Sequence, residues 1–370
     1  MNLKIRIFIG NVIFISCLSF NIANSQILRD SSALCLVKEA VDNIYDLRFS
    51  KASEECEKLY HSYPGHPIGY LLKGMMTYWE NYPLLPSSPA HVSYEADMRQ
   101  CIKLCEKKHE QSDNAEYLLA NLCARGMLLL FYADNGLSME VIPLTTSTYQ
   151  YIRHSFDYTS SISDFYFFTG LYDYYREVYP DAYPIYKALA FLFPKGDRNK
   201  GFKDLQMAAK SSIVLKAEAA SFLYSICLSY EDDFEQASSY TKALHQQYPA
   251  NMQYLAACIK NLLLIKQYDE AEKLILNADT TFRNPYFQSQ MCVFNGILQE
   301  KKYHNTELAR QHYEKGISSI SQFGVFGNEY SAYAYFGLSR ISDMNGDKKN
   351  KKTYRKKAME LADFKKVDFD

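Results

Sequence analysis

The segment Phe234-Glu-Gln-Ala237 returns as Tyr268-Asp-Glu-Ala271, so that the two alanines lie 34 residues apart. In both segments an aromatic residue stands three positions before a small residue, within a pattern of apolar residues that is typical of helices. A period of about 34 residues is the length of a unit of two antiparallel helices that stacks on its neighbours. The stretch from Ala217 to Arg283 therefore predicts an all-α solenoid built from repeated helix pairs.

A further copy of this pattern, Phe49-Ser-Lys-Ala52, lies near the start of the chain. Ala52 precedes Pro64 by twelve residues, and Ala237 precedes Pro249 by the same number. Proline ends a helix at such a position because it has no N–H to donate and restricts the backbone of the residue before it. The repeat therefore has the same phase in both halves of the chain.

The composition is that of a folded, helix-rich protein. Hydrophobic residues make up 48% of the 370 residues and charged residues 22%, and 32 tyrosines and 22 phenylalanines stand against one tryptophan. The net charge of -1 argues against a nucleic-acid partner, because phosphate binding needs lysine and arginine concentrated on one face. We therefore expect no binding of nucleic acid.

Only the C-terminal segment concentrates basic side chains. They are Lys348, Lys349, Lys351, Lys352, Arg355, Lys356 and Lys357. The last helix of a repeat array must present polar residues to solvent, and this is the favoured interpretation of the cluster. Contact with acidic lipid headgroups, with polysaccharide or with an acidic partner is the functional alternative.

Residues 1–25 are typical of a signal peptide. Lys4 and Arg6 form the charged start, residues 7–20 the apolar run, and Ala23-Asn-Ser25 a cleavage site of small residues. The sequence therefore predicts export, to the periplasm or to the outer membrane.

The cysteines bear on attachment and on redox state. A lipid on Cys17 is the alternative to ordinary cleavage, although Phe14 and Ile15 stand where a lipid-attachment motif prefers leucine and a small residue. The other cysteines are scattered at apolar helix positions, so most are expected to be free buried thiols. They are Cys35, Cys56, Cys101, Cys105, Cys123, Cys227, Cys258 and Cys292.

We divide the folded chain into N-terminal helical repeats at 26–135, an aromatic-rich irregular joint at 136–200 and a C-terminal array at 201–370. The joint contains Phe165-Tyr-Phe-Phe168, whose consecutive rings cannot all face one side of a helix. Three prolines are expected to break the joint into short helices: Pro180, Pro184 and Pro194. In the array we expect helices at 202–212, 216–230, 234–248, 252–265 and 268–277, then at 286–301, 307–321, 330–344 and 348–364.

At these residues the chain resembles the tetratricopeptide repeat family. Small and proline positions of the family are matched by Ala40, Ala52, Pro64, Ala237, Ala271 and Pro249, and its aromatic position by Phe234 and Tyr268. Leu59 and Leu244 depart from the pattern, since the family prefers alanine there, and the hallmark tryptophan is absent. The resemblance implies a right-handed superhelix of antiparallel helix pairs that binds other proteins.

The central segment shows a second, weaker resemblance. Gly170, the stretch Pro194-Lys-Gly-Asp-Arg-Asn-Lys-Gly201 and Leu205 are similar to divergent repeat proteins of the mitochondrial outer-membrane and inclusion-body-clearance group. This resemblance implies that the joint belongs to the repeat fold.

Cys101, Cys105 and His109 are spaced so that they share one helix face, where thiolate and imidazole groups could bind zinc. The first and last are about 12 Å apart along a helix, which is too far for one ion. A buried core face is therefore the favoured interpretation, and no metal site is predicted.

The segment from Gly196 to Gly201 has the glycine spacing of a phosphate-binding loop, but Phe202 and Lys203 follow where the loop requires lysine and then serine or threonine. We favour a turn in which Asp197 caps the next helix. The chain also lacks the His-Glu-x-x-His and Gly-x-Ser-x-Gly signatures. No catalytic residue and no cofactor are predicted.

We therefore expect a non-catalytic scaffold that binds a protein or peptide in a concave groove lined by the first helix of each pair. The candidate partner-binding residues on these helices are Tyr224, Leu228, Tyr254, Lys260, Asn261, Gln288 and Asn295. One alternative is a hydrolase-like enzyme with a polar pocket near residues 165–179. The other is an envelope protein anchored by a lipid on Cys17.

Overall fold

The computed structural model describes residues 27–109, 115–182, 193–281, 283–362 and 369, and in these residues it is helical without strands. The proposed signal peptide at 1–25, with Cys17, lies outside the described residues. The helices are α2 (Ser31–Tyr45), α3 (Phe49–Ser62), α4 (Pro67–Glu80), α5 (Ala90–His109), α6 (Ala115–Asp134), α7 (Ser138–Ser155), α8 (Phe165–Ala182), α10 (Arg198–Ser211), α11 (Lys216–Ser229), α12 (Phe234–Gln247), α13 (Met252–Leu264), α14 (Tyr268–Thr281), α15 (Pro285–Lys301), α16 (Thr306–Ile320), α17 (Asn328–Met344) and α18 (Lys348–Leu361). Short 3₁₀ turns are η1 (Ile27–Arg29), η2 (Phe156–Tyr158) and η4 (Ser321–Gly327). The all-α prediction is confirmed.

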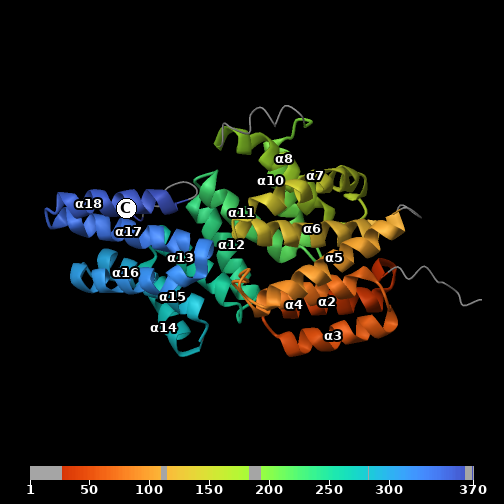
Figure 1. Cartoon of the computed structure of the whole chain (residues 1–370), viewed down its shortest axis with the longest axis horizontal. Helices are drawn as coiled ribbons and strands as arrows, with labels where there is room; N and C mark the ends of the chain where they lie inside the picture. The colour runs from red at the N-terminus through yellow and green to blue at the C-terminus, as the bar shows by residue number, and fades with distance from the viewer. Residues whose placement is uncertain (1–26, 110–114, 183–192, 282, 363–368, 370) are drawn as a thin grey trace, which may run out of the picture.

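Each helix packs on the next one along the chain, and several pack on the next but one (Figure 1). The second kind of contact joins α2 to α4, α4 to α6, α13 to α15 and α15 to α17. We call α2, α4, α6, α8, α11, α13, α15 and α17 the first helices, and the helix that follows each of them the second helix. In these four cases a first helix touches both its own partner and its counterpart in the next pair.

The turn from first to second helix repeats along the chain. In six pairs the residue two positions before the second helix has a positive φ: Leu47, Gly136, Asp232, Lys266, His304 and Gly346. A left-handed residue after a helix allows its last carbonyl groups to accept backbone hydrogen bonds. Such bonds run from Arg48 N to Asn43 O, Leu137 N to Tyr132 O and Gln267 N to Leu262 O, each 2.8 Å long, and from Asp347 N to Ser342 O at 2.9 Å. A shared turn thus supports the repeat independently of the alanine spacing.

The central segment is more regular than expected. Helix α7 is 18 residues long and follows Gly136 through the same turn as the other pairs. The prediction that Pro180 breaks the segment is wrong, because Pro180 lies inside α8, which continues to Ala182. Pro184 lies outside the described residues, and Pro194 lies between helices.

Two glycines bring α8 and α10 into backbone contact. A Cβ atom on Gly170 would lie 2.9 Å from the carbonyl oxygen of Gly201, and one on Gly201 would lie 2.4 Å from the backbone nitrogen of Tyr174. Cβ atoms do not approach backbone so closely, so side chains are excluded from both positions. The glycines singled out in the sequence therefore serve the packing of this helix pair.

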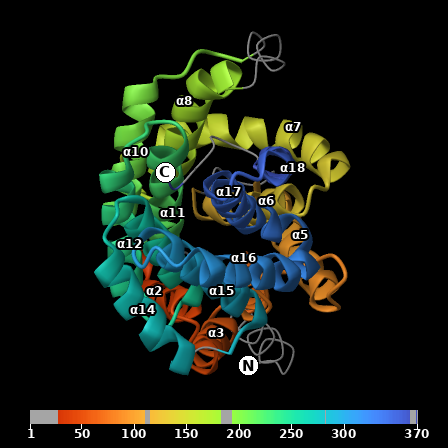
Figure 2. The same ribbon diagram turned by 90° about the vertical axis from the view of Figure 1, so that its left-hand side faces the viewer.

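The chain curves so that its first pair meets α12 and α13 (Figures 1 and 2). Asn251 Nδ2 donates to the carbonyl oxygen of Tyr45 at 2.7 Å, and the backbone N–H of Ala250 donates to Asp46 at 2.9 Å. Buried apolar side chains form one main cluster over residues 27–254 and a second over 255–369, and Tyr82 packs against both. None of the described helices combines the length and the hydropathy needed to cross a membrane.

Candidate binding site on the first helices

The structure separates the seven predicted partner-binding residues into two groups. Tyr224, Gln288 and Asn295 are partly exposed on α11 and α15. Buried positions are taken by Leu228, Tyr254, Lys260 and Asn261. The amide of Asn261 donates to the carbonyl oxygen of Ala257 within its own helix. These four buried residues contact other parts of this chain and are not open to a partner. The prediction included them because sequence periodicity does not distinguish a groove from the core between neighbouring first helices.

Lys260 is the centre of a charged cluster that joins three first helices. Its Nζ atom lies 2.9 Å from Oε1 of Glu329 on α17 and 5.4 Å from the centre of the Tyr224 ring on α11. The hydroxyl of Tyr333 donates to the same carboxylate of Glu329. A buried ammonium group needs both an opposite charge and further favourable contacts, and this cluster supplies them.

The charges of this pair are stabilised by each other. Burial alone would lower the pKa of Lys260, but the carboxylate of Glu329 and the Tyr224 ring outweigh it and raise that pKa. The protein around the half-exposed carboxylate of Glu329 displaces part of its water and would raise its pKa, but Lys260 and the hydroxyl of Tyr333 lower that pKa below its ordinary value. Both groups are therefore charged at neutral pH.

An aromatic cluster centred on Tyr82 continues this face toward the N-terminal pairs. The Tyr82 ring stacks on Trp79 with centres 5.4 Å apart and meets Phe326 at 5.7 Å and Tyr286 at 6.2 Å. The side chain of Asn284 donates to the carbonyl oxygen of Tyr82 at 3.3 Å. These contacts hold the end of α4 against the start of α15, more than 200 residues later.

Two carboxyl groups near Tyr82 have raised pKa values. Burial, reinforced by the charge of Glu218, raises the pKa of Asp134 to about 7. Burial also raises the pKa of Glu218, although the hydroxyl of Tyr45 donates to it at 3.0 Å and opposes that effect. Asp134 ends α6 and Glu218 begins α11, so both belong to first helices. Burial raises the pKa of the Tyr82 hydroxyl, and the charges of Asp134 and Glu218 raise it further.

Sequence reasoning missed Asp134, Glu218 and Glu329. The last two lie in the first turn of a helix, where an acidic residue is ordinarily explained by its interaction with the helix dipole. Their location in first helices is the sequence feature that could have marked them as candidate site residues, and it can be used once the helix pairs are assigned.

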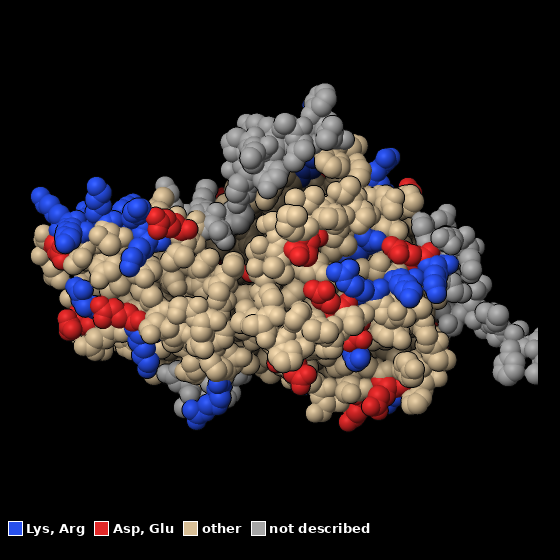
Figure 3. All heavy atoms as spheres, viewed as in Figure 1, with Lys and Arg blue, Asp and Glu red and all other residues tan. Residues whose placement is uncertain are grey.

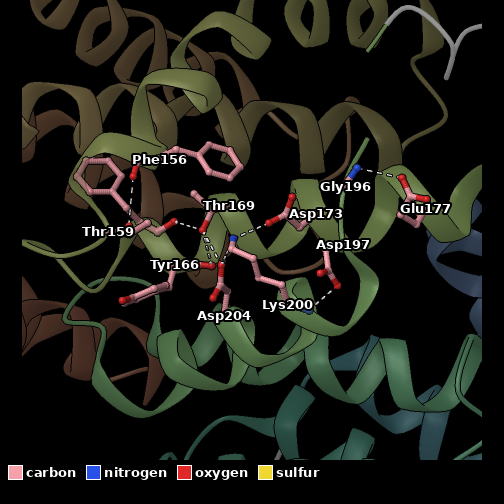
Figure 4. A network of polar contacts seen from close by, with 11 residues as sticks. Phe156, Thr159, Tyr166, Thr169, Asp173, Glu177, Gly196, Asp197, Lys200 and Asp204 are labelled. Atoms are coloured by element: carbon pink, nitrogen blue, oxygen red, sulfur yellow. Dashed lines mark hydrogen bonds and ion pairs between the residues drawn. The ribbon is translucent and has the colours of Figure 1, made fainter. Parts of the chain in front are cut away.

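A separate polar network lies between α8 and α10 (Figure 4). Nζ of Lys200 lies 2.6 Å from Asp173 and 2.9 Å from Asp204, and it sits 5.3 Å from the centre of the Phe156 ring. The hydroxyl of Thr169 donates to Asp204 at 3.3 Å. Lys200 on α10 thus links a carboxylate of α8 to one of its own helix beside the contact made by Gly170 and Gly201, so the network stabilises the helix pair.

The loop before α10 has the predicted structural role. Asp197 caps α10 by accepting a hydrogen bond of 2.9 Å from the backbone N–H of Lys200, which confirms that interpretation. The backbone N–H of Gly196 donates to Glu177 at 2.9 Å (Figure 4). This N–H therefore binds a carboxylate of the protein itself.

The cysteines are free thiols in the described residues. Cys101 and Cys105 are buried, and burial raises the pKa of the Cys105 thiol. A buried protonated thiol behaves as a small apolar side chain. No three histidine, cysteine or acidic side chains in the described ranges are grouped so that they could hold a metal ion.

Basic side chains gather along α18 at the surface (Figure 3). Several of them have partners near the helix: Lys351 pairs with Asp343 at 2.7 Å, Lys356 pairs with Glu360 at 3.7 Å, and Lys357 lies 5.2 Å from the centre of the Tyr335 ring. Ala358 is the buried residue of this helix. Tyr354 and Leu361 pack beside it, so the helix presents charge outward and packs through its apolar side.

Two hollows are found among the described residues, and neither is lined by residues 165–179 themselves. An open hollow of about 460 Å³ lies between two turns and is lined by Asp232, Asp233, Phe234, Glu235, Leu264, Ile265 and Lys266. A small cavity of about 30 Å³ lies beside His66 and Glu116, whose side chains are 2.6 Å apart. The carboxylate of Glu116 also accepts hydrogen bonds from the backbone of Ile27 and Leu28. Glu116 therefore fixes the backbone at the start of the described residues against α6.

Comparison with known proteins identifies no relative: no protein-family model matches the chain, and no curated protein matches it.

Proposed function

We propose that this protein is a non-catalytic scaffold of the tetratricopeptide type, which binds a peptide or an extended protein segment on its first helices. The observation that carries the proposal is the cluster of Tyr224, Lys260 and Glu329, where three first helices bring an aromatic ring and a charged pair together. Tyr224 and Glu329 keep part of their surface exposed, so a ligand can contact them.

In this proposal the helix pairs are antiparallel and wind into a right-handed superhelix. The 34-residue spacing of Ala237 and Ala271 and the shared left-handed turn residue of six pairs support this geometry. A preformed array of this kind loses little conformational freedom on binding, so contacts to a peptide contribute directly to affinity.

The proposed ligand contacts an aromatic and acidic surface. Tyrosine rings supply apolar area and a hydroxyl group, and carboxylates supply acceptors for the peptide N–H groups or for basic side chains. Gln288 and Asn295 on α15 could extend the surface with amide groups, which donate to and accept from a peptide backbone.

We further propose that the protein is exported and works in the periplasm or at the outer membrane. The support is the charged start, apolar run and small-residue site in residues 1–25. Mass analysis of the mature N-terminus tests this point. A chain beginning at Gln26 supports cleavage, a chain beginning at a lipid-modified Cys17 supports the anchored alternative, and an uncleaved chain contradicts both.

Site-specific photo-crosslinking tests the binding proposal. A photoreactive amino acid replaces Tyr224 or Asn295 on first helices, or Lys273 as a control, because Lys273 is exposed on the second helix α14. Each variant is produced in the native cells and irradiated, and crosslinked peptides are identified by mass spectrometry.

We expect the same partner to be crosslinked from both first-helix positions and not from the control. Crosslinks that form equally from the control, or from that position alone, would show that the first helices are not the binding surface.

A further inference from the structure

The side chain of Phe369 is inserted into the protein. It is 6% exposed and belongs to the apolar cluster of residues 255–369. Its ring meets the ring of Tyr333 edge to face, with centres 5.0 Å apart and planes at 89°. This is the favourable geometry for two aromatic rings.

Tyr333 connects Phe369 to the charged cluster described above. Its hydroxyl donates to Glu329, which pairs with Lys260 at 2.9 Å, and Lys260 in turn lies over the ring of Tyr224. The ring of Phe369 is thus one residue removed from the surface that we propose for partner binding.

A continuous series of rings supports this position. Tyr333 meets Tyr330 at 6.0 Å and 85°, Tyr330 meets Tyr286 at 6.1 Å and 90°, and Tyr286 meets Tyr82 at 6.2 Å and 62°. The rings come from α17, from α15 and from Tyr82, two residues after the end of α4, so the series joins two first helices to the loop that follows a third. The place of Phe369 is therefore one more edge-to-face position at the end of an aromatic series.

We propose that this position is a binding site for an aromatic side chain of a peptide partner, and that Phe369 occupies it as an intramolecular competitor. The inference rests on the proposed function, since it names the feature by which the partner is recognised. A partner with a phenylalanine or tyrosine would place its ring against Tyr333 and displace Phe369.

Tethering explains why the site is filled in the free protein. A ligand joined to its own site by a short segment has an effective concentration of about a millimolar. A free peptide of similar intrinsic affinity must exceed that concentration, whereas a partner with contacts to Tyr224 and Glu329 as well gains additional affinity. Phe369 would therefore exclude ligands that offer only an aromatic ring and admit partners that also contact Tyr224 and Glu329.

Fluorescence anisotropy with a labelled synthetic peptide tests the proposal. The peptide has the sequence of residues 363–370, and a second peptide has alanine at the position of Phe369. Three proteins are compared as full chains: the unchanged protein, Phe369→Ala, and the matched control Phe193→Ala, which truncates an exposed phenylalanine elsewhere. Circular dichroism and thermal melting verify that each protein is folded.

We expect Phe369→Ala to bind the first peptide at least about tenfold more tightly than the unchanged protein and the Phe193→Ala control. Adding Tyr333→Leu to Phe369→Ala should abolish this gain, and the alanine peptide should show no preference. Equal affinity of the three proteins for the first peptide, or equal binding of both peptides to Phe369→Ala, would overturn the proposal.

If Phe369→Ala does not fold, 4-fluorophenylalanine at position 369 of the otherwise unchanged chain provides a second measurement. Its ¹⁹F resonance should differ from that of the fluorinated free peptide, and Tyr333→Leu should move it toward the free position. A resonance identical to that of the free peptide would contradict insertion of the ring.

The two proposals fail separately. A partner crosslinked from Tyr224 without any peptide preference of Phe369→Ala would refute the aromatic site and leave the scaffold function in place. A clear peptide preference with no partner crosslinked from Tyr224 would refute the scaffold function and leave the aromatic site in place.

Discussion

Lys260 on α13 and Glu329 on α17 form an ion pair of 2.9 Å between first helices that are separated by one other first helix. The two side chains are unequally exposed, at 2% for Lys260 and 45% for Glu329. The pair is therefore anchored by a buried cation and accessible from its anionic side. This asymmetry suits a surface that must be ordered before a ligand arrives.

The same asymmetry predicts unequal effects of removing either partner. Glu329→Gln leaves the buried ammonium of Lys260 without an opposite charge and should lower the free energy of unfolding by about 1–3 kcal/mol. Lys260→Met leaves a carboxylate that water can reach and should cost less than about 1 kcal/mol. Urea unfolding of both variants measures the difference, and a larger loss for Lys260→Met would contradict the structure.

The glycine contact between α8 and α10 predicts a strong effect of one methyl group. Gly201→Ala places a Cβ atom 2.4 Å from the backbone nitrogen of Tyr174, so the helices must separate, at a cost of about 2 kcal/mol or more. The matched control is Gly126→Ala in α6, where no atom outside the helix backbone lies near the new Cβ. This control should gain about 0.5–1 kcal/mol from better helix propensity. Thermal melting that ranks the two variants in the reverse order would disprove the contact.

The repeated alanines predict overpacking when they are enlarged. Ala237 and Ala271 are fully buried where helices pack, so Ala237→Leu and Ala271→Leu should each destabilise the array by about 1–3 kcal/mol. Lys273→Leu, at an exposed position of α14, is the control and should change stability little. Unchanged melting temperatures for both alanine variants would show that the assigned phase of the repeat is wrong.

Asp134 predicts a dependence of stability on pH. Its pKa is about 7 in the folded chain against an ordinary value of 3.8, so the folded state holds this proton more tightly than the unfolded state does. The contribution of Asp134 to stability is therefore present below about pH 4 and is lost as the pH rises to about 7.

The variant Asp134→Asn cannot lose this proton. Its stability relative to the unchanged protein should rise by about 1–4 kcal/mol between pH 4 and 7 and then level off. Unfolding measured across this range for both proteins tests the assignment. A constant difference between them would mean that the pKa of Asp134 is not raised.

The fold was largely predictable because its signals are local. The phase of Ala237 and Ala271 located the helix pairs, and the expected helices at 216–230, 234–248 and 252–265 are observed as α11, α12 and α13, with differences only at their ends. Pro180 misled the prediction because the sequence shows its missing N–H, but not that α8 continues through it to Ala182.

The candidate site was predictable only in part because it depends on contacts between distant pairs. Tyr224 and Lys260 were singled out as first-helix residues, but their common partner Glu329 lies 69 residues after Lys260. The meeting of Tyr82 with Tyr286 depends on how the array curves, and curvature is a sum of small rotations that no single repeat reveals. The same holds for the insertion of Phe369 beside Tyr333.

The most direct test of the central claim is the affinity of the crosslinked partner for the protein, measured by isothermal titration calorimetry. Tyr224→Ala on a first helix is compared with Lys273→Ala on a second helix, after both proteins have been shown to be folded. We predict that Tyr224→Ala weakens binding by at least about tenfold, as expected for an aromatic residue at the centre of an interface, and that Lys273→Ala binds as the unchanged protein does. Equal affinities for the two variants, or a loss confined to Lys273→Ala, would contradict the claim that the first helices bind the partner.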